Sequence, residues 1–297
     1  MTAETVPASR LYAPVTIRRA HPNDVAACAQ ICYDAFYKIN AQHSFPPDIP
    51  SPELASWILS SMFSHSGFYC VVAELDGQVV GSNCLDERSA IAGVGPITIK
   101  PDIQNRGMGR KLMAAVLDRA RERNASGVRL IQAAFHGRSL SLYTSLGFDV
   151  REPLSVMQGE PLRMNMEGFS VRRAESSDME DCNRVCMGAH GHNRHGELMD
   201  AVAQGNATVV ERNGRITGYT TGLGFLGHSV AESNFDLQAL IASAESFMGP
   251  GILVPTRNAS LFRWCLEKGL QVIEPMTLMS LGLYNEPRGA YLPSISF

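Results

Sequence analysis

The chain of 297 residues lacks features that would assign it to several large classes of protein. It has no apolar run near the roughly 18 residues that a membrane-spanning helix needs, so we expect no transmembrane helix. Residues 1–14 lack the basic and apolar segments of a secretory signal. The net charge is −3, without the basic excess typical of proteins that neutralise nucleic-acid phosphates.

Cysteine usage excludes two further classes. Seven cysteines in a chain of this length do not make a disulfide scaffold, and no C-x-x-C pair suggests a zinc site. An odd number of thiols is typical of a reducing compartment. We therefore expect a cytoplasmic protein with no metal and with no membrane or nucleic-acid partner.

The composition is that of a globular protein, with 45% hydrophobic and 19% charged residues, and the length suits two domains of about 150 residues. An internal repeat supports two domains, because the first residues recur after a shift of 154. The matching pairs are Arg18 and Arg172, Arg19 and Arg173, Ala20 and Ala174, Asp24 and Asp178, Cys28 and Cys182, and Cys32 and Cys186. The cysteines at i and i+4 share a helix face, where small apolar core packing is the favoured interpretation.

Two more pairs of similar segments follow in the same order: residues 77–81 match 214–218, and residues 146–148 match 268–270. The chain is therefore predicted to hold two copies of one fold. We expect a flexible tail over residues 1–13, a first domain over 14–160, a linker over 161–168 and a second domain over 169–297.

The first copy alternates strand and helix patterns, which indicates an α/β mixed sheet. We expect helices over residues 24–37, 53–63, from 109 to about 123, and 139–146. We expect strands over residues 15–19, 68–74, 78–85, 91–99 and 128–135, and a last strand after Gly147.

Residues 97–109 carry the strongest chemical signal. A strand ends at Pro101, a glycine-bearing loop follows, and a helix begins. Free backbone N–H groups at a helix N-terminus bind anions, a pyrophosphate included. Gly107 and Gly109 let the backbone approach phosphates, and Arg106, Arg110 and Lys111 add local positive charge. No G-K-[S/T] follows, so the loop is not a Walker A motif.

In this context the sequence resembles the GNAT superfamily of acyl-CoA-dependent N-acyltransferases over about residues 15–155. The residues that carry the resemblance are Ile97, Thr98, Ile99, Pro101, Gln104, Asn105, Arg106, Gly107, Met108, Gly109, Leu142, Tyr143, Gly147 and Phe148. The resemblance implies two tandem domains, each a splayed mixed sheet flanked by helices, and acetyl-CoA as co-substrate. The loop over residues 104–109, with Arg110 beside it, would bind the pyrophosphate, and the backbone of 97–99 would pair with the pantetheine arm and polarise the thioester carbonyl.

Tyr143 matches the family tyrosine beside the sulfur, where a phenol can protonate the leaving thiolate. The family often has Asn seven residues before this tyrosine and Ala four before it, and here these are His136 and Ser139. We count both as coenzyme contacts, with His136 also open as a base or a plain loop residue. Asp86, Glu87 and Glu74 are favoured as solvated charges, so no general base is assigned.

The second copy resembles the same superfamily more faintly and lacks a Q-x-x-G-x-G loop. Cys265 stands where Tyr143 would align, and Asn258 falls at the family Asn. We interpret this half as a degenerate copy that shapes the acceptor pocket or a dimer interface. Together with the loop over residues 45–48, it is expected to form the acceptor pocket, and the aromatic tail over 284–297 to pack on the body.

Three other motifs are interpreted as structural. Residues 222–227 spell G-x-G-x-x-G, but a nicotinamide site would need a helix to begin there. His190, His192 and His195 are assigned to a loop rather than to zinc, and Cys265 to a helix core rather than to nucleophilic catalysis.

The sequence thus predicts an N-acetyltransferase that moves an acetyl group from acetyl-CoA to a primary amine by direct attack. A small-molecule acceptor is favoured over a protein, and the protein is expected as a monomer or homodimer. A non-catalytic acyl-CoA sensor or assembly module is the alternative.

Overall fold

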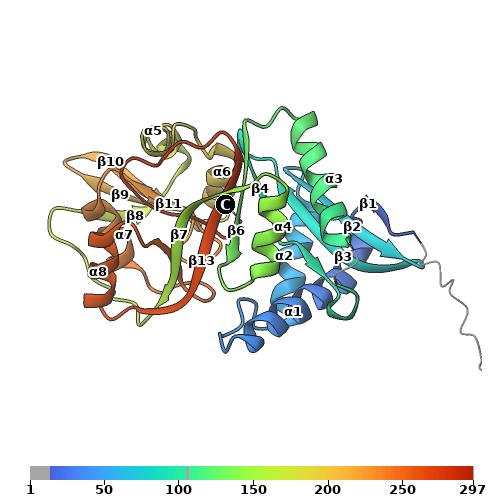
Figure 1. The fold of residues 1–297 in the computed structure, drawn as a ribbon. Coiled ribbons are helices and arrows are strands. Elements are labelled where there is room, and N and C mark those ends of the chain that lie inside the picture. Colours follow the sequence, from blue (N-terminus) through green and yellow to red (C-terminus); the bar gives the residue numbers. More distant parts are fainter. Residues whose placement is uncertain (1–13, 105–106, 297) are drawn as a thin grey trace, which may run out of the picture.

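The computed structural model describes residues 14–104 and 107–296 and contains a nine-stranded and a five-stranded sheet. Figure 1 shows helices packed on both sheets, with the first half of the chain at the right and the second half at the left. None of the helices in the described ranges has both the length and the apolar character needed to cross a membrane. The expected tail over residues 1–13 lies outside the described residues.

The two halves place most of their elements in the same order. The first half contains β1 (Thr16–Arg19), the 3-10 turn η1 (Pro22–Asp24), α1 (Val25–Gln42), α2 (Pro52–Ser64), β2 (Phe68–Leu75), β3 (Gln78–Asp86), β4 (Ile91–Val94), β5 (Thr98–Ile99), η2 (Pro101–Ile103), α3 (Met108–Glu122), β6 (Gly127–Ala133), α4 (Gly137–Ser145) and β7 (Asp149–Gln158). The second half contains β8 (Ser170–Arg173), η3 (Ser176–Asp178), α5 (Met179–His190), α6 (His195–Ala203), β9 (Thr208–Arg212), β10 (Arg215–Thr220), β11 (Ser229–Ala231), α7 (Asn234–Ser243), β12 (Ile252–Pro255), α8 (Ala259–Glu267), β13 (Gln271–Gly282) and β14 (Ala290–Leu292). The strand expected over residues 91–99 is therefore two short strands, because the chain leaves the sheet after Val94 and returns at Thr98. In the described part of the chain, β5 and η2 have no counterpart in the second half and β14 has none in the first.

The repeat is visible atom by atom at the start of each copy. Arg18 donates from Nη1 and Nη2 to the two carboxylate oxygens of Asp24 at 2.7 and 2.9 Å, and Arg172 bonds Asp178 at the same two distances. Each aspartate also accepts a backbone N–H three residues earlier, at 2.8 Å. The paired arginine holds the pKa of each aspartate below its usual value. These bonds fix the turn from the first strand into α1 or α5.

The cysteines expected to pack in helix cores do so. Cys28 and Cys32 are on the buried face of α1, among the apolar side chains of α2 and β2, and Cys182 and Cys186 are on the buried face of α5. All seven cysteines are buried free thiols. The sulfurs therefore serve as small apolar packing groups.

The last strand of each copy is exchanged between the two halves. The nine-stranded sheet runs β1-β2-β3-β4-β6-β13-β7-β12, with β5 paired to β3. The antiparallel strand β13 lies between β6 and β7, and β7 lies between β13 and β12. Figure 1 shows these strands at the centre of the molecule. The domain bounds at residues 160 and 169 remain a prediction, and the hydrogen-bonded sheet itself continues across them.

We predict that a fragment ending at residue 160 does not fold alone, because without β13 both β6 and β7 keep unpaired edges. It should aggregate or lack a cooperative unfolding transition, whereas co-expression with residues 161–297 should restore a soluble one-to-one complex. Size-exclusion chromatography and thermal unfolding followed by circular dichroism test this. A monomeric fragment with cooperative unfolding would contradict it.

Candidate active site

A cavity of about 700 Å³ opens where the nine-stranded sheet splays. Strand β4 pairs in parallel with β6 only as far as Gly93 opposite Arg129. Beyond that point the chain turns away, and β5 pairs with β3 instead. Residues 97–99 and 130–133 therefore form two walls that diverge, with the cavity between them. Backbone groups on the inner edges of these walls are available to a ligand.

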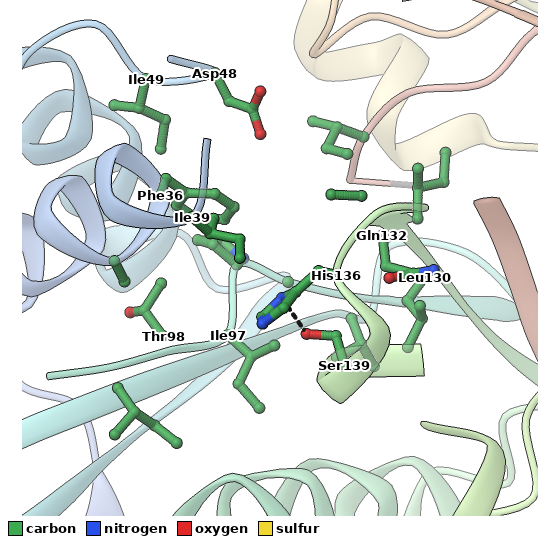
Figure 2. Close-up of a pocket in the computed structure, with 18 of the residues that line it drawn as sticks. Phe36, Ile39, Asp48, Ile49, Ile97, Thr98, Leu130, Gln132, His136 and Ser139 are labelled. Carbon is green, nitrogen blue, oxygen red and sulfur yellow. Dashed lines mark hydrogen bonds between the residues drawn. The ribbon is translucent and has the colours of Figure 1, made fainter. Parts of the chain in front are cut away.

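The structure brings the sequence-predicted site residues to this one cavity. Its lining includes Ile97, Thr98, Ile99, Gln104, Gly107, Met108, Gly109, Arg110, His136, Ser139 and Tyr143. Asn105 and Arg106 lie outside the described residues. Figure 2 shows Ile97 and Thr98 across the open space from Leu130 and Gln132. The roles of these residues remain predictions, whereas their convergence is a fact of the fold.

The N-terminus of α3 meets the cavity without a side-chain cap. Gly107 is the N-cap residue, with a left-handed φ of +76°, and nothing lies within 4 Å of the position of a Cβ there. A Cβ on Gly109 would instead lie 3.2 Å from Leu142, so Gly109 also lets α3 pack closely on α4. Gln104 donates from Nε2 to the carbonyl of Ile99 at 3.1 Å. The first turn of α3 is thus open to an anion, with Arg110 beside it.

The N-terminus of the matching helix in the second copy, α7, is capped by a side chain. Ser233 caps α7, and the buried carboxylate of Asp236 in its first turn accepts hydrogen bonds from Arg212 and Thr217. In addition β14 pairs antiparallel with β11 and contacts β12, so chain tail residues fill the place beside β11. These contacts give a physical reason for the expected loss of coenzyme binding in the second half.

Tyr143 lies on α4 at the cavity wall, with only 6% of its surface exposed. Burial raises the pKa of its phenol to about 12, against a smaller opposing effect of a hydrogen bond with Ser139. The hydroxyl of Ser139 also bonds Nδ1 of His136 at 2.7 Å (Figure 2). Burial lowers the pKa of His136 to about 4, so this imidazole is neutral. Near neutral pH the wall therefore holds an un-ionised phenol next to a serine and a neutral imidazole.

The carboxylates weighed from the sequence as bases are engaged elsewhere. Asp86 pairs with Arg88 at 2.6 Å, Glu87 with Arg119 at 2.7 Å and Glu74 with Arg18 at 2.8 Å. The cavity lining contains none of these three carboxylates, but it does contain Asp48.

Sequence reasoning missed two acidic residues, Asp48 in the cavity lining and Glu274 beside it. Asp48 belongs to the loop expected near the acceptor, and its side chain interacts with Glu274 of β13. Glu274 shares the buried face of β13 with Met276 and Leu278 at alternate positions. A charged residue on an otherwise apolar strand face was the signal that could have found it.

The second half supplies part of the cavity lining, and its expected role in an acceptor pocket stays a prediction. Its contributions are Phe225, Leu226, Met248, Gly249, Pro250, Met276, Ile295 and Ser296. The backbone N–H of Ile295 donates to the carbonyl of Phe225 at 2.8 Å, which anchors the tail on the body. Residues 222–227 form a loop between β10 and β11, and the next helix begins only at Asn234, so the helix that a dinucleotide motif requires does not start there.

The other two motifs lie away from the cavity. Nε2 of His190 lies 3.0 Å from Nε2 of buried His228. Within the described part of the chain, no three His, Cys, Asp or Glu side chains are grouped so as to hold a metal. Cys265 is buried in α8, and burial raises the pKa of its thiol to about 12, which opposes thiolate formation.

Comparison with known sequences concerns the first half of the chain. Residues 33–148 match the model of the acetyltransferase (GNAT) family. Over 150 residues the chain is 29% identical to the mycothiol acetyltransferase of Renibacterium salmoninarum. The alignment covers 48% of this chain and 43% of that enzyme. The chain thus matches less than half of the length of this relative.

Comparison with solved structures concerns the whole fold. A protein of Pyrococcus horikoshii assigned to the acetyltransferases aligns with a TM-score of 0.73 at 18% identity, over 97% of this chain and 99% of that chain. A GCN5-related N-acetyltransferase from Sphaerobacter thermophilus aligns at 0.61 and 16% identity, over 93% and 98%. A tandem GNAT protein from the clavulanic acid biosynthesis pathway aligns at 0.55 and 14% identity, over 92% and 100%. The predicted family resemblance and the predicted tandem α/β fold are both confirmed.

We predict that buried histidines weaken the fold in acid. Burial, with the charges of Arg129 and Arg194, lowers the pKa of His192 from 6.5 to about 4, and burial also lowers that of His190 and His228. Between these values the unfolded chain binds protons that the folded chain does not, so stability is complete above pH 6.5 and falls as the pH drops toward 4.

For His192 the loss of unfolding free energy between pH 7 and pH 5 should be about 2 kcal/mol. Urea unfolding at the two pH values measures it, and a His192→Gln variant should show a smaller difference than the wild type. An equal pH dependence in both proteins would contradict the assignment.

Proposed function

We propose that the chain is a member of the GNAT family of acetyltransferases and that it transfers an acetyl group from acetyl-CoA to the primary amine of a small-molecule acceptor. The observation that carries this proposal is the convergence of an uncapped helix N-terminus, a splayed strand edge and a buried tyrosine on one cavity. We also keep as proposals a catalytic domain over residues 14–160, a monomer or homodimer, and a cytoplasmic location.

The residues present fit acetyl-CoA. The space beside Gly107 admits a pyrophosphate at the positive end of α3, and Arg110 supplies a cation that no carboxylate neutralises among the described residues. The free edge of residues 97–99 offers backbone groups to the amides of a pantetheine arm in the manner of an added strand. The thioester then lies at the inner end of the cleft, toward Tyr143.

The proposed reaction is direct attack. A neutral amine nitrogen attacks the thioester carbonyl carbon, and a backbone N–H in residues 97–99 stabilises the oxygen that gains charge. The C–S bond breaks, and the phenol of Tyr143 donates its proton to the thiolate. The phenol is then restored by the proton that leaves the amine nitrogen. Ser139 and neutral His136 hold the phenol in place.

The shape of the cavity favours a small acceptor. Its far end is bounded by α1, α2 and segments of the second half, so an acceptor is enclosed by side chains from both copies. The name of the Renibacterium relative, which refers to mycothiol, supports a small acceptor over a protein.

We predict that acetyl-CoA stabilises the protein through the α3 N-terminus. Acetyl-CoA at about 100 times its Kd should raise the Tm by about 5 to 10 °C, and Gly107→Glu should abolish this rise by placing a carboxylate in the phosphate site. Gly214→Glu is the matched control, because Gly214 has a φ of +73° and open space around its Cβ position but lies in a distant turn. A rise that survives Gly107→Glu, or none in the wild type, would remove the support for coenzyme binding here.

We predict that Tyr143→Phe lowers kcat by about 10²-fold or more, because it removes the acid and keeps the ring packing. The KM for acetyl-CoA should change little. Thiol release with a broad panel of primary amines measures both values. Wild-type protein that binds acetyl-CoA but releases no thiol above the hydrolysis background would favour the non-catalytic acyl-CoA sensor, and an active Tyr143→Phe would exclude the acid role.

A further inference from the structure

Two carboxyl groups from opposite halves of the chain meet at the far end of the cavity. Asp48, from the loop between α1 and α2, is 5% exposed and lines the cavity. Glu274, on the exchanged strand β13, is 1% exposed and interacts with Asp48. Asn40 donates from Nδ2 to Asp48 at 3.0 Å and to the carbonyl of Pro46 at 2.7 Å, which fixes the loop.

This carboxyl pair has no cationic partner among the described residues. Apart from Asp48, no hydrogen-bond partner meets either carboxyl oxygen of Glu274 in the ranges the structure describes. Burial and the neighbouring carboxyl raise the pKa of Glu274 to about 9, and burial raises that of Asp48. Two buried carboxyl groups in contact do not readily ionise together, and a cation placed beside them would favour their ionised form.

A third polar group faces the same space. Gln132 on β6 is 5% exposed and lines the cavity, and neither atom of its amide has a hydrogen-bond partner in the described structure. Figure 2 shows the Asp48 carboxylate and the Gln132 amide facing the open space from different walls. Leaving a buried polar group unpaired is unfavourable, so a ligand that bonds it recovers this loss.

The walls between these polar groups are largely apolar, and the cavity lining also contains Lys38 of α1. The apolar residues include Phe36, Ile39, Ile49, Leu226, Met276 and Ile295. A ligand that suits this end of the cavity thus has an apolar body, one positive charge and a group that exchanges hydrogen bonds with an amide.

We propose that Asp48, Glu274 and Gln132 form the acceptor subsite. The carboxyl pair binds an ammonium group of an otherwise largely apolar acceptor, at a different nitrogen from the one that is acetylated, and Gln132 bonds a polar group of the same molecule. This inference rests on the proposed function for the identity of the cavity and narrows its acceptor to cationic amines. The subsite exists only in the tandem chain, since Asp48 and Glu274 come from different copies. Acidic acceptors are disfavoured, because the carboxyl pair repels them.

The test compares amines with alcohols of the same skeleton, so that charge is the main difference. Phenethylamine is paired with 2-phenylethanol and hexylamine with hexanol, and the Tm is measured with saturating coenzyme A, which cannot transfer an acetyl group. In the wild type, saturating amine should raise the Tm by about 2 to 5 °C more than its alcohol. Asp48→Asn and Glu274→Gln should each lose this difference and keep the Tm shift caused by coenzyme A.

Glu53→Gln is the control, because Glu53 is an exposed carboxylate at the start of α2 outside the cavity lining, and it should retain the full difference. Asp48→Asn keeps an oxygen that can accept the hydrogen bond from Asn40, so this variant is expected to fold. If it does not fold, the result for Glu274→Gln alone decides whether the subsite exists. Equal shifts for amine and alcohol in the wild type, or a difference that persists in both variants, would overturn the subsite.

The two proposals fail separately in this experiment. A coenzyme A shift without amine selectivity leaves the acetyltransferase proposal standing and refutes the subsite. Amine selectivity that depends on Asp48 and Glu274, without any coenzyme A shift, supports the cation site and refutes the assigned cofactor.

Discussion

Antiparallel pairing between β7 and β13 joins the two copies, and most of the architecture depends on it. The register runs from Gln271 opposite Gln158 to Ser280 opposite Asp149, so each closing strand is held along most of its length by the other. Because β13 also pairs with β6, the first sheet is completed only by a strand from the end of the chain. This arrangement carries Glu274 and Met276 into the neighbourhood of α1 and α2 and makes the cavity a product of both halves.

The two copies differ most where their third helices begin. In the first copy the N-cap is Gly107, which leaves the backbone N–H groups of α3 without a side-chain partner. In the second copy the side-chain oxygen of Ser233 accepts the backbone N–H of Asp236. The Asp236 carboxylate lies in the first turn of α7 and is balanced by Arg212. A helix N-terminus favours negative charge in either case. In the second copy the Asp236 carboxylate supplies this negative charge, whereas in the first copy no side chain of the described residues caps the helix.

Local features of the fold were predictable from the sequence, and long-range ones were not. The Arg18–Asp24 and Arg172–Asp178 pairs, the glycine loop before α3 and the buried helix cysteines all depend on residues close together in the chain. The exchange of β7 and β13 could not be predicted, because either strand has the same alternating pattern whichever neighbour it pairs with. The Asp48–Glu274 contact follows from that exchange, which is why neither residue stood out as part of a site.

The pairing of β14 with β11 has a consequence for ligand stoichiometry. A segment tethered by the short connection from β13 is present beside β11 at a millimolar effective concentration, whatever is free in solution. A free ligand that would bind beside β11 must displace β14, and diluting the protein does not lower the local concentration of β14. If coenzyme binds the first copy as proposed, a tandem chain of this kind would behave like a dimer in which half-of-the-sites occupancy is built into the covalent structure.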